Sequence, residues 1–481
     1  MTALEEFLTA LEDILGEISS VVWGPFVLIP LLLFTGIFLT VRLRLLQFRV
    51  LFHALWLALF RRKEHHSVEG DISHYQALST ALAATVGVGN IAGAALAIGV
   101  GGPGALFWMW VVGLVGMATK YSEAVLGVKY RRKDARGEQS GGPMFYLRRG
   151  LPGGLGLVLG GAFAIFGAIA SFGIGNGTQA NTVSQQLGDV WNVPEPVTGI
   201  ALVILAGAVI VGGIKSIGRF AAAVVPLMVV LYIALTLLVL LINIGDLPGA
   251  LALVFTEAFT GASATGGLLG SALLFAIQQG VARGIFSNES GLGTGGIAAA
   301  AAKTDQPVRQ GMVSMTQTFI DTIIVVTMTC LVIIVTGAWQ AEDAADGSLL
   351  TSQALADGLS TLSPALAPVG TYGVAIAVAV FAFTTIVGWS YYGERCIDFL
   401  VGRKGVLPFR LVFVAVVYVG ATVPLDLVWT FSDVANGLMA LPNLVGLLLL
   451  SGVVVAETKR YFDNPNWKDP EAPMPKVYDN A

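Results

Sequence analysis

The chain is dominated by long stretches that contain no charged side chain. Only 12% of its 481 residues are charged, whereas a soluble domain has about 25%. About 20 apolar helical residues cross the hydrocarbon core of a bilayer, and several stretches reach that length, among them 22–41 and 220–242. These stretches predict an all-α integral membrane protein.

We expect about eleven membrane-spanning helices, because with that number nearly all Lys and Arg residues fall on one side of the membrane. The positive-inside rule then places the N-terminus outside and the C-terminus in the cytoplasm of a multi-pass protein of the plasma (inner) membrane. The acidic segment 4–18 lacks the basic start of a signal peptide, so the first span is expected to remain in the mature protein. The expected spans are 22–41, 76–100, 105–128, 155–185, 197–213, 219–243, 265–288, 311–338, 366–388, 407–424 and 434–455.

Two spans carry glycine and polar residues near mid-membrane. Gly87 and Gly89 lie about ten residues from either end of the second span, which is ~15 Å of helix and half the hydrocarbon thickness. Gln278–Gly280 has a similar depth in the seventh span, and 291–296 is a second candidate nearer its cytoplasmic end. Unwound backbone that lines a cavity tolerates such residues, so both spans are predicted to be interrupted. Close packing of small residues is the alternative explanation.

Interrupted helices five spans apart are typical of inverted-repeat transporters, in which the binding site lies between the repeats. Half-helix N-termini can bind a carboxylate, and half-helix C-termini can bind a cation. The chain is accordingly divided into an extracellular amphipathic N-terminus (1–21), an extra transmembrane helix (22–41), a cytoplasmic basic and interfacial segment (42–75), a first five-helix repeat (76–243), an extracellular linker (244–264), a second five-helix repeat (265–455) and a cytoplasmic tail (456–481).

Neutral oxygen atoms near the first interruption suggest a sodium site. Thr384 and Thr385 are adjacent hydroxyls in the ninth span, and unwinding would free the carbonyls of Ala83 and Val86. With the carbonyl of Phe381, these atoms form the kind of hard oxygen set that a sodium ion prefers. The alternative is that each threonine only bonds back to its own helix.

The sequence allows more than one role for the charged residues within the spans. Asp321 could couple protons, pair with Arg283 as a cytoplasmic gate, or be a structural hydrogen-bonded acid. Lys120 and Glu123 are expected to form a local ion pair, with the lysine reaching toward the cytoplasmic surface.

Several motifs resemble the alanine or glycine:cation symporter family, within the group that shares the LeuT-type fold. The resemblance covers about residues 24–459 and rests most clearly on Gly101-Gly-Pro-Gly-Ala-Leu-Phe-Trp-Met-Trp110. The further matching stretches are 87–93, 172–176, 283–293, 388–394 and 441–457. The resemblance implies a LeuT-type 5+5 inverted repeat with an extra N-terminal helix. It also implies symport of alanine or glycine into the cell driven by Na⁺, with H⁺ as the alternative coupling ion.

The resemblance also implies two sets of binding residues. The cation-site residues by position in the shared fold are Ala83, Val86, Phe381, Thr384 and Thr385. The expected substrate contacts are Thr85, Gly87, Gly89, Asn90, Phe172, Asn176, Gln278, Gln279 and Gly280, with Trp389 as a wall of the pocket.

Other classes of protein have less support. The sequence contains no HExxH or GxSxG motif and no carboxylate cluster at membrane depth, so an enzyme is not expected. The sequence has no repeated selectivity-filter loop, so it does not indicate a channel. A receptor with a transporter's fold stays an alternative. The basic residues are accounted for by topology, so the expected partners are a small amino acid and the lipid bilayer, with no nucleic acid and no obligate protein partner.

Overall fold

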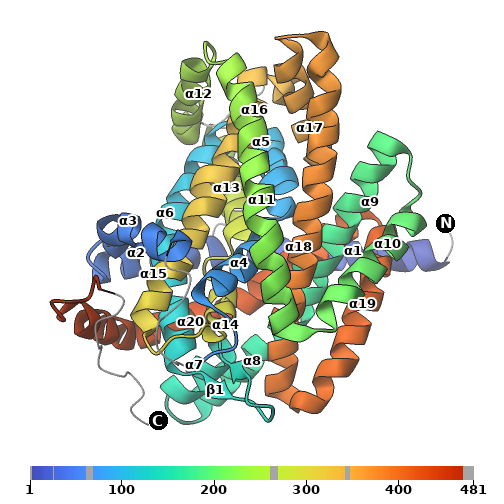
Figure 1. The fold of residues 1–481 in the computed structure, drawn as a ribbon. Coiled ribbons are helices and arrows are strands. Elements are labelled where there is room, and N and C mark those ends of the chain that lie inside the picture. Colours follow the sequence, from blue (N-terminus) through green and yellow to red (C-terminus); the bar gives the residue numbers. More distant parts are fainter. Residues whose placement is uncertain (1–2, 25, 61–68, 261–268, 342–346, 470–481) are drawn as a thin grey trace.

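The computed structural model describes residues 3–24, 26–60, 69–260, 269–341 and 347–469. Within these ranges the chain is a bundle of helices with one small antiparallel hairpin of two strands, β1 (Arg132–Lys133) and β2 (Gln139–Ser140), in which Arg132 faces Ser140. Figure 1 shows α12 and α17 at one end of the bundle and β1 and α7 at the other.

Three helices precede the first interrupted helix. They are α1 (Ala3–Val22), α2 (Leu28–Arg42) and α3 (Leu46–Leu59). The chain bends by 82° between α2 and α3, where Arg44 and Leu45 both adopt left-handed backbone angles. α1 and α2 pack on α20, and α3 packs beside α15.

The next group of helices contains two irregular spans. α4 and α5 are separated by a break, and α8 and α9 are joined through a π-helical turn, η2. The elements are α4 (His74–Thr85), η1 (Gly89–Gly93), α5 (Ala94–Gly101), α6 (Gly104–Lys129), α7 (Pro143–Gly150), α8 (Gly153–Phe172), η2 (Gly173–Gly177), α9 (Thr178–Trp191), α10 (Glu195–Ile210) and α11 (Gly213–Ile242).

The remaining helices include a second break, between α13 and α14, and an unbroken α18 of 35 residues. The elements are α12 (Leu247–Thr260), α13 (Leu269–Asn288), α14 (Thr294–Ala300), α15 (Pro307–Thr318), η3 (Phe319–Val326), α16 (Thr327–Thr336), η4 (Ala338–Gln340), α17 (Gly347–Ser360), η5 (Pro364–Leu366), α18 (Ala367–Val401), η6 (Arg403–Gly405), α19 (Val406–Thr422) and α20 (Leu425–Phe462).

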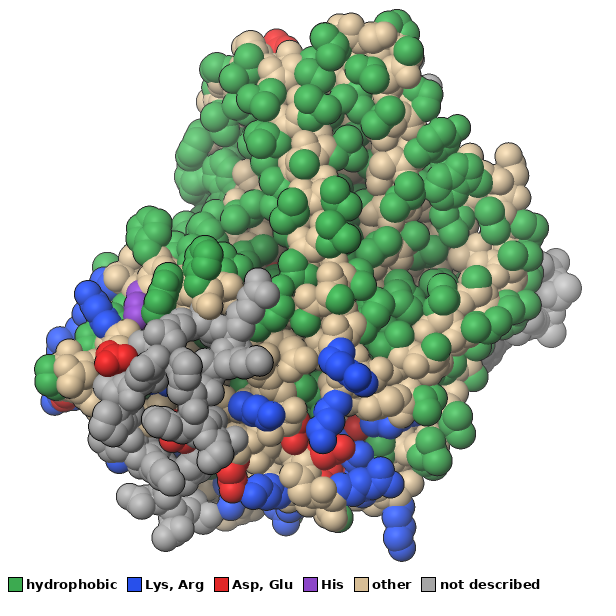
Figure 2. All heavy atoms as spheres, in the orientation of Figure 1, with side chains coloured by type: hydrophobic (Ala, Val, Ile, Leu, Met, Phe, Trp, Pro, Cys, Tyr) green, Lys and Arg blue, Asp and Glu red, His purple; other side chains and the backbone are tan. Residues whose placement is uncertain are grey.

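The outer surface of the bundle is suited to lipid. Leu227, Val230 and Leu231 of α11 are each about 60% exposed, and Figure 2 shows apolar side chains over most of this face. Lys and Arg side chains gather instead at the end that carries β1 and α7. An all-α membrane protein is therefore confirmed. By length and composition, seven described helices can cross a membrane, or up to nine with the bent pairs, so the total of eleven stays a prediction.

Candidate functional site

The break between α4 and α5 lies at Gly87, as the sequence predicted. α4 ends at Thr85, and helical structure resumes at Gly89 after a bend of 52°. The Thr85 hydroxyl donates to the Ala81 carbonyl one turn earlier, at 3.0 Å. A Cβ atom on Gly87 would overlap the Thr385 hydroxyl, so the close approach of α18 requires glycine here.

Side-chain oxygens accept hydrogen bonds from the backbone N–H groups that this break leaves without a helical partner. The Gly87 N–H donates to Oδ1 of Asn90 at 2.8 Å. The Val88 N–H donates to Oε1 of Gln179 at 3.1 Å, and Gln179 Nε2 in turn donates to the Ile174 carbonyl of η2 at 2.8 Å. Because a buried amide without a partner costs free energy, these two side chains stabilise the broken conformation.

The residues proposed for the sodium site lie together beside this break. The Thr385 hydroxyl donates to the Ala83 carbonyl at 3.0 Å and to the Phe381 carbonyl at 3.1 Å. The Thr384 hydroxyl donates to the same Phe381 carbonyl at 2.8 Å, and Val86 caps the end of α4. All five residues are buried, and the atoms that meet are neutral oxygens, which suit a sodium ion. Both threonines also bond back to their own helix, as the alternative explanation expected.

The second interruption does not lie at Gln278–Gly280, so this part of the sequence prediction is wrong. α13 runs unbroken through these residues, with Gln278 and Gln279 half-buried. Gly280 faces α6, where an added Cβ would meet the Ala105 carbonyl and the Trp108 side chain. Glycine here allows close packing of two helices, which is the alternative that the sequence left open.

The break instead occupies residues 289–293, close to the second candidate segment. Glu289, Gly291 and Gly293 have positive φ angles of 57°, 99° and 86°. The Gly291 and Gly293 N–H groups donate to one carboxylate oxygen of Glu123, at 2.9 and 3.0 Å. Asn443 Nδ2 donates to the same oxygen at 2.9 Å and to the Gly291 carbonyl at 2.8 Å.

Lys120 and Glu123 are not the expected pair at the surface. Their exposed fractions are 1% and 0%. Lys120 Nζ donates to the Glu289 carbonyl at 3.3 Å, so both residues of α6 bind the backbone of the second break. They act as its scaffold because unwound backbone at this depth needs buried partners.

Asp321 joins the two breaks through neutral hydrogen-bond donors. Asn90 Nδ2 donates to one carboxylate oxygen at 2.7 Å. Ser287 and Thr322 donate their hydroxyls to the other, at 2.9 and 2.8 Å. Asn90 belongs to the first break, and Ser287 lies in the last turn of α13 before the second.

The pairing of Asp321 with Arg283 that the sequence suggested is wrong. Arg283 forms an ion pair of 2.9 Å with Asp433 of α20 and lies over the Trp429 ring. Asp321 is thus left with the neutral partners described above.

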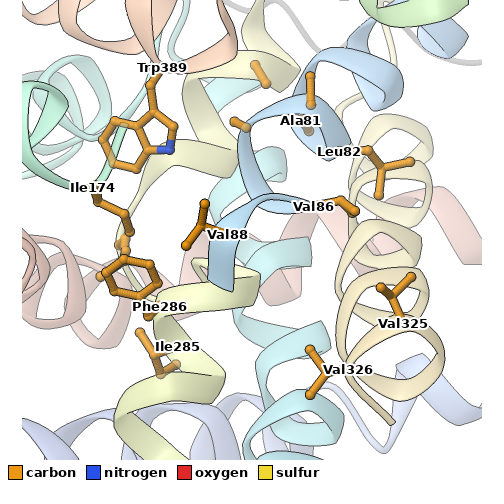
Figure 3. Packing of buried hydrophobic residues seen from close by; sticks show 14 of the residues in the cluster. Ala81, Leu82, Val86, Val88, Ile174, Ile285, Phe286, Val325, Val326 and Trp389 are labelled. Atoms are coloured by element: carbon orange, nitrogen blue, oxygen red, sulfur yellow. The ribbon is translucent and has the colours of Figure 1, made fainter. Parts of the chain in front are cut away.

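An apolar cluster of four side chains packs beside the breaks. Val88, Ile174, Phe286 and Trp389 are buried and come from η1's N-terminal side, η2, α13 and α18 (Figure 3). Trp389 Nε1 donates to a Glu289 carboxylate oxygen at 2.6 Å, which fixes the indole beside the second break.

Other predicted substrate residues divide into two groups. A Cβ on Gly89 would lie 3.1 Å from Ser287 Cα, so Gly89 is where the two breaks approach each other. Phe172 instead contacts the Phe413 ring, and Asn176 Nδ2 donates to the Phe413 carbonyl at 2.7 Å. These last two side chains are thus held against α19.

Comparison with known proteins identifies the family. The model of the sodium:alanine symporter family matches residues 8–473. The chain belongs to this family. Like other members of this symporter family, it is a transporter and not an enzyme.

Named relatives of this symporter cover nearly its whole length. The sodium/alanine symporter AgcS of Methanococcus maripaludis is 51% identical, with 93% of this chain and 97% of that protein aligned. The probable sodium/glutamine symporter GlnT of Bacillus subtilis is 37% identical over 94% of this chain and 91% of its own. The putative sodium/proton-dependent alanine carrier YrbD of Bacillus subtilis is also 37% identical, over 93% and 92% of the two chains.

A solved structure supports the fold of the symporter. The crystal structure of MhsT in complex with L-phenylalanine superposes with a TM-score of 0.56 at 15% sequence identity, covering 81% of this chain and 98% of that one. At this identity the likeness concerns the fold alone, and it confirms the predicted LeuT-type fold.

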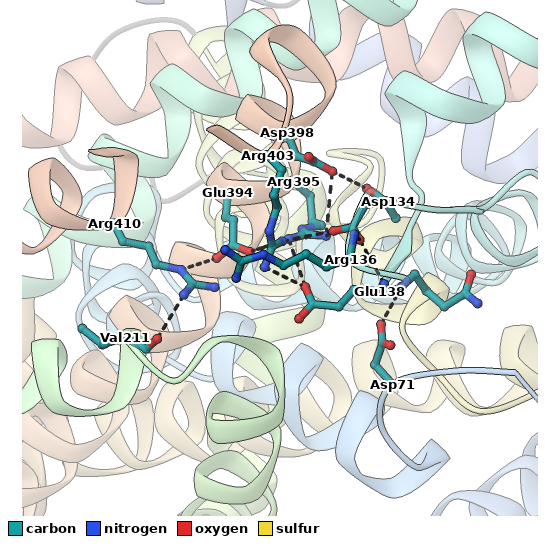
Figure 4. Close-up of polar contacts among 12 residues, drawn as sticks. Asp71, Asp134, Arg136, Glu138, Val211, Glu394, Arg395, Asp398, Arg403 and Arg410 are labelled. Carbon is teal, nitrogen blue, oxygen red and sulfur yellow. Dashed lines mark hydrogen bonds and ion pairs between the residues drawn. The ribbon is translucent and has the colours of Figure 1, made fainter. Parts of the chain in front are cut away.

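One end of the symporter is held together by ion pairs, which we call the arginine network: Arg395, Arg403 and Arg410 with Asp134, Glu138 and Glu394 (Figure 4). Arg410 Nε lies 2.7 Å from Glu394, and Arg403 lies 2.9 Å from Glu138. Arg395 contacts both Glu394 and Asp134. The network thus connects the end of α18 and the start of α19 to the β1–β2 hairpin.

The hairpin also reaches the helices that carry the breaks. Arg131, directly before β1, donates to the carbonyls of Ala300, the last residue of α14, and Ala302, at 2.8 and 2.7 Å. The Gln139 N–H donates to Asp71, which precedes α4, at 2.7 Å. The hairpin region therefore connects the arginine network, and with it α18, to the ends of both interrupted helices.

Two residues of the site, Gln179 and Asn443, were missed by the sequence analysis, and Glu123 was noted only as a partner of Lys120. Each is a buried polar side chain in an apolar span, which is the signal that could have found them. The break atoms that they bind lie 91 residues away for Gln179, 168 for Glu123 and 152 for Asn443, so local patterns do not indicate these contacts.

Proposed function

We propose that this sodium-coupled amino-acid symporter carries alanine or glycine into the cell together with Na⁺. The observation that carries the proposal is the meeting of the Thr385 hydroxyl with the carbonyls of Ala83 and Phe381 where α4 ends. A sodium ion there would be bound by these oxygens and those of Thr384 and Val86. It would thereby hold α18 against the broken helix.

The substrate carboxylate is proposed to bind at the start of the half-helix that follows Gly87. The N–H groups of Gly87 and Val88 lie at this positive end; here they donate to Asn90 and Gln179, and the substrate carboxylate would take the place of these acceptors. Thr85 and Gly89 flank the same position. Because sodium and carboxylate would then share one short segment, each should raise the affinity for the other.

The small size of the substrate follows from the apolar wall. Val88, Ile174, Phe286 and Trp389 fill the space beside the breaks, so a methyl group or hydrogen would be accepted better than a long side chain. Discrimination of this kind differs from that of the relative named as a glutamine symporter, and glutamine is therefore the informative competitor.

Transport is proposed to occur by alternating access, with repeats 76–243 and 265–455 moving relative to each other and 22–41 as the extra helix. The arginine network would face the cytoplasm of a plasma-membrane protein whose N-terminus is outside. The gathering of Lys and Arg at that end supports this orientation.

A proton-coupled version of the same transport is the second candidate. It is favoured by the buried carboxylate of Asp321 between the two breaks, and one relative is named a sodium/proton-dependent carrier.

The decisive experiment is uptake of radiolabelled alanine into proteoliposomes under an inward Na⁺ gradient, compared with an equal choline gradient. We expect sodium-dependent accumulation that glycine reduces and glutamine does not. Thr385→Ala should abolish the sodium dependence. Thr336→Ala is the matched control, because the Thr336 hydroxyl bonds only to carbonyls of its own helix at 2.9 and 3.3 Å. Uptake driven by a pH gradient and indifferent to sodium would replace this function by the proton-coupled one.

A further inference from the structure

An apolar groove lies on the outer surface of the bundle between α1, α19 and α20. Its volume is about 440 Å³, and every described residue that lines it is apolar or glycine, among them Leu11 and Leu15 of α1 and Val428 and Phe431 of α20. Val419 of α19, which also lines it, is 51% exposed. Because the exposed apolar surface of this bundle is suited to lipid, the groove opens toward the acyl chains of the bilayer.

Hydrocarbon is the natural occupant of this groove. Its lining on α19 runs from Val412 to Val423, along a helix that is long and apolar enough to cross a membrane. A lipid chain gains little free energy on moving from other chains into such a groove, since both surroundings are equally apolar. The groove therefore accepts an acyl chain, and the headgroup decides which lipid stays.

The helix that borders the groove, α1, is amphipathic. Its apolar side chains recur at the spacing of one helix face: Leu11, Ile14, Leu15 and Ile18. Leu11 and Leu15 line the groove, whereas Ile14 and Ile18 are 57% and 39% exposed. Figure 1 shows α1 lying across the direction of α11 and α18, as an amphipathic helix does at the surface of a bilayer.

The charge of α1 is opposite to that of most helices at a membrane surface. Its sequence holds five acidic residues and no Lys or Arg. Of the acidic side chains, Asp13 and Glu17 are exposed and Glu12 is half-buried. A surface helix rich in Lys and Arg is attracted to anionic lipids. By the same electrostatics, α1 repels an anionic headgroup and attracts an ammonium group.

We propose that the groove binds an acyl chain of a zwitterionic phospholipid with an ammonium headgroup, of the phosphatidylethanolamine class. The ammonium group lies against the acidic side chains Glu12, Asp13 and Glu17 of α1. This lipid site goes beyond the proposed function, because it depends on neither the coupling ion nor the amino acid.

The lipid site shares a stretch of α20 with the ion pair of Arg283. Phe431 lines the groove, and Asp433 two residues later pairs with Arg283 of α13 at 2.9 Å. Trp23, directly after α1, donates from Nε1 to the Asp433 carbonyl at 2.8 Å. A lipid held between α1 and α20 therefore stabilises the position of α20 against α13, the helix that precedes the second break.

The test is lipid binding to the purified full chain, delipidated in detergent and titrated with phosphatidylethanolamine or with phosphatidylglycerol of the same acyl chains. Native mass spectrometry counts the bound lipids. We expect the first lipid bound to prefer phosphatidylethanolamine by about fivefold, which is about 1 kcal/mol and typical of an exposed ion pair. The triple variant Glu12→Gln/Asp13→Asn/Glu17→Gln should lose this preference and keep the binding. Asp246→Asn, at an exposed acid directly before α12, is the control and should keep the preference.

A second pair of variants tests the groove without changing any charge. Val416 lines the groove and is half-buried, so Val416→Trp places a large side chain inside it and should abolish this binding for both lipids. Leu411→Trp adds the same side chain at a 60% exposed position of α19 outside the groove and should bind lipid as the wild type does.

Two results would overturn the proposal. Equal affinity of the wild type for the two lipids, or tighter binding of phosphatidylglycerol, would remove the headgroup assignment. Unchanged lipid binding by Val416→Trp would show that the groove is not the site. If Val416→Trp fails to fold, the triple variant of α1 still decides, because its substitutions lie outside the groove lining.

Discussion

The two breaks and the arginine network of this symporter bury polar groups in opposite ways. At the breaks, backbone amides and carbonyls are bound by neutral side chains and by a few carboxylates, as at Asn90 and Glu123. In the arginine network, charges of opposite sign neutralise one another directly, as Arg410 and Glu394 do. A neutral oxygen set has room for an added cation, whereas a matched set of ion pairs has none. The breaks are therefore the region suited to binding an ion, whereas the arginine network is suited to connecting helices.

The largest effect on this comparison is expected from a substitution of Glu394 in the arginine network. Its side chain is 2% exposed and contacts Arg395, Arg403 and Arg410. Glu394→Gln keeps one acceptor oxygen but removes the negative charge that these guanidinium groups share, so we expect the folded state to lose about 3–5 kcal/mol. A lower melting temperature of the purified protein would show this. Glu69→Gln is the control, because the Glu69–Lys133 pair is more than half exposed and should change little.

A substitution at Gly87 tests the neutral region. In Gly87→Ala the new Cβ would collide with the Thr385 hydroxyl, and overpacking of this kind costs about 1–3 kcal/mol. We expect sodium-driven uptake to fall by tenfold or more in the proteoliposome assay.

Gly93→Ala provides the comparison in the same helix, because nothing lies within 4 Å of a Cβ at that position. Equal loss of uptake in both variants would mean that helix flexibility, and not the contact with Thr385, explains the effect.

Trp389→Phe should have a smaller effect. It removes the hydrogen bond of 2.6 Å to Glu289 and keeps an aromatic wall, so only the net worth of one hydrogen bond, about 0.5–1.5 kcal/mol, is lost. We expect a higher KM for alanine with sodium affinity unchanged. An altered sodium affinity with normal KM would instead connect Glu289 to the ion.

The smallest effect concerns acid stability of the arginine network. Burial alone would raise the pKa of Asp134, but N–H groups of Arg136 and Glu138 and the charges of Arg395 and Arg403 lower it below its usual value. Its contribution to stability is therefore present above the unfolded pKa of about 3.9 and is lost as the pH falls through the lower folded pKa. Asp134→Asn should flatten the melting temperature between pH 5 and 3, roughly the range of that titration. If the melting temperature of Asp134→Asn fell with pH as that of the wild type does, the lowered pKa of Asp134 would not explain the acid sensitivity.

The sequence predicted the break at Gly87 because glycine at mid-span is unusual. It also predicted that the Thr384–Thr385 pair lies beside the end of this broken helix, where Thr385 contacts Ala83. It failed at Gln278–Gly280 because close helix packing and unwinding both favour glycine. The true second break depends on a left-handed Glu289 and on Glu123, which lies 168 residues before Gly291. Local patterns carry no information about such long-range partners.

α18 has a consequence for how a load is transmitted through the molecule. It runs unbroken from Ala367 to Val401, carrying Thr385 midway and Glu394 near its end. Nine residue steps, ~14 Å of continuous helix, separate them. If an ion bound at Thr385 moved α18 there, the unbroken helix would carry the movement to Glu394 and the arginine network.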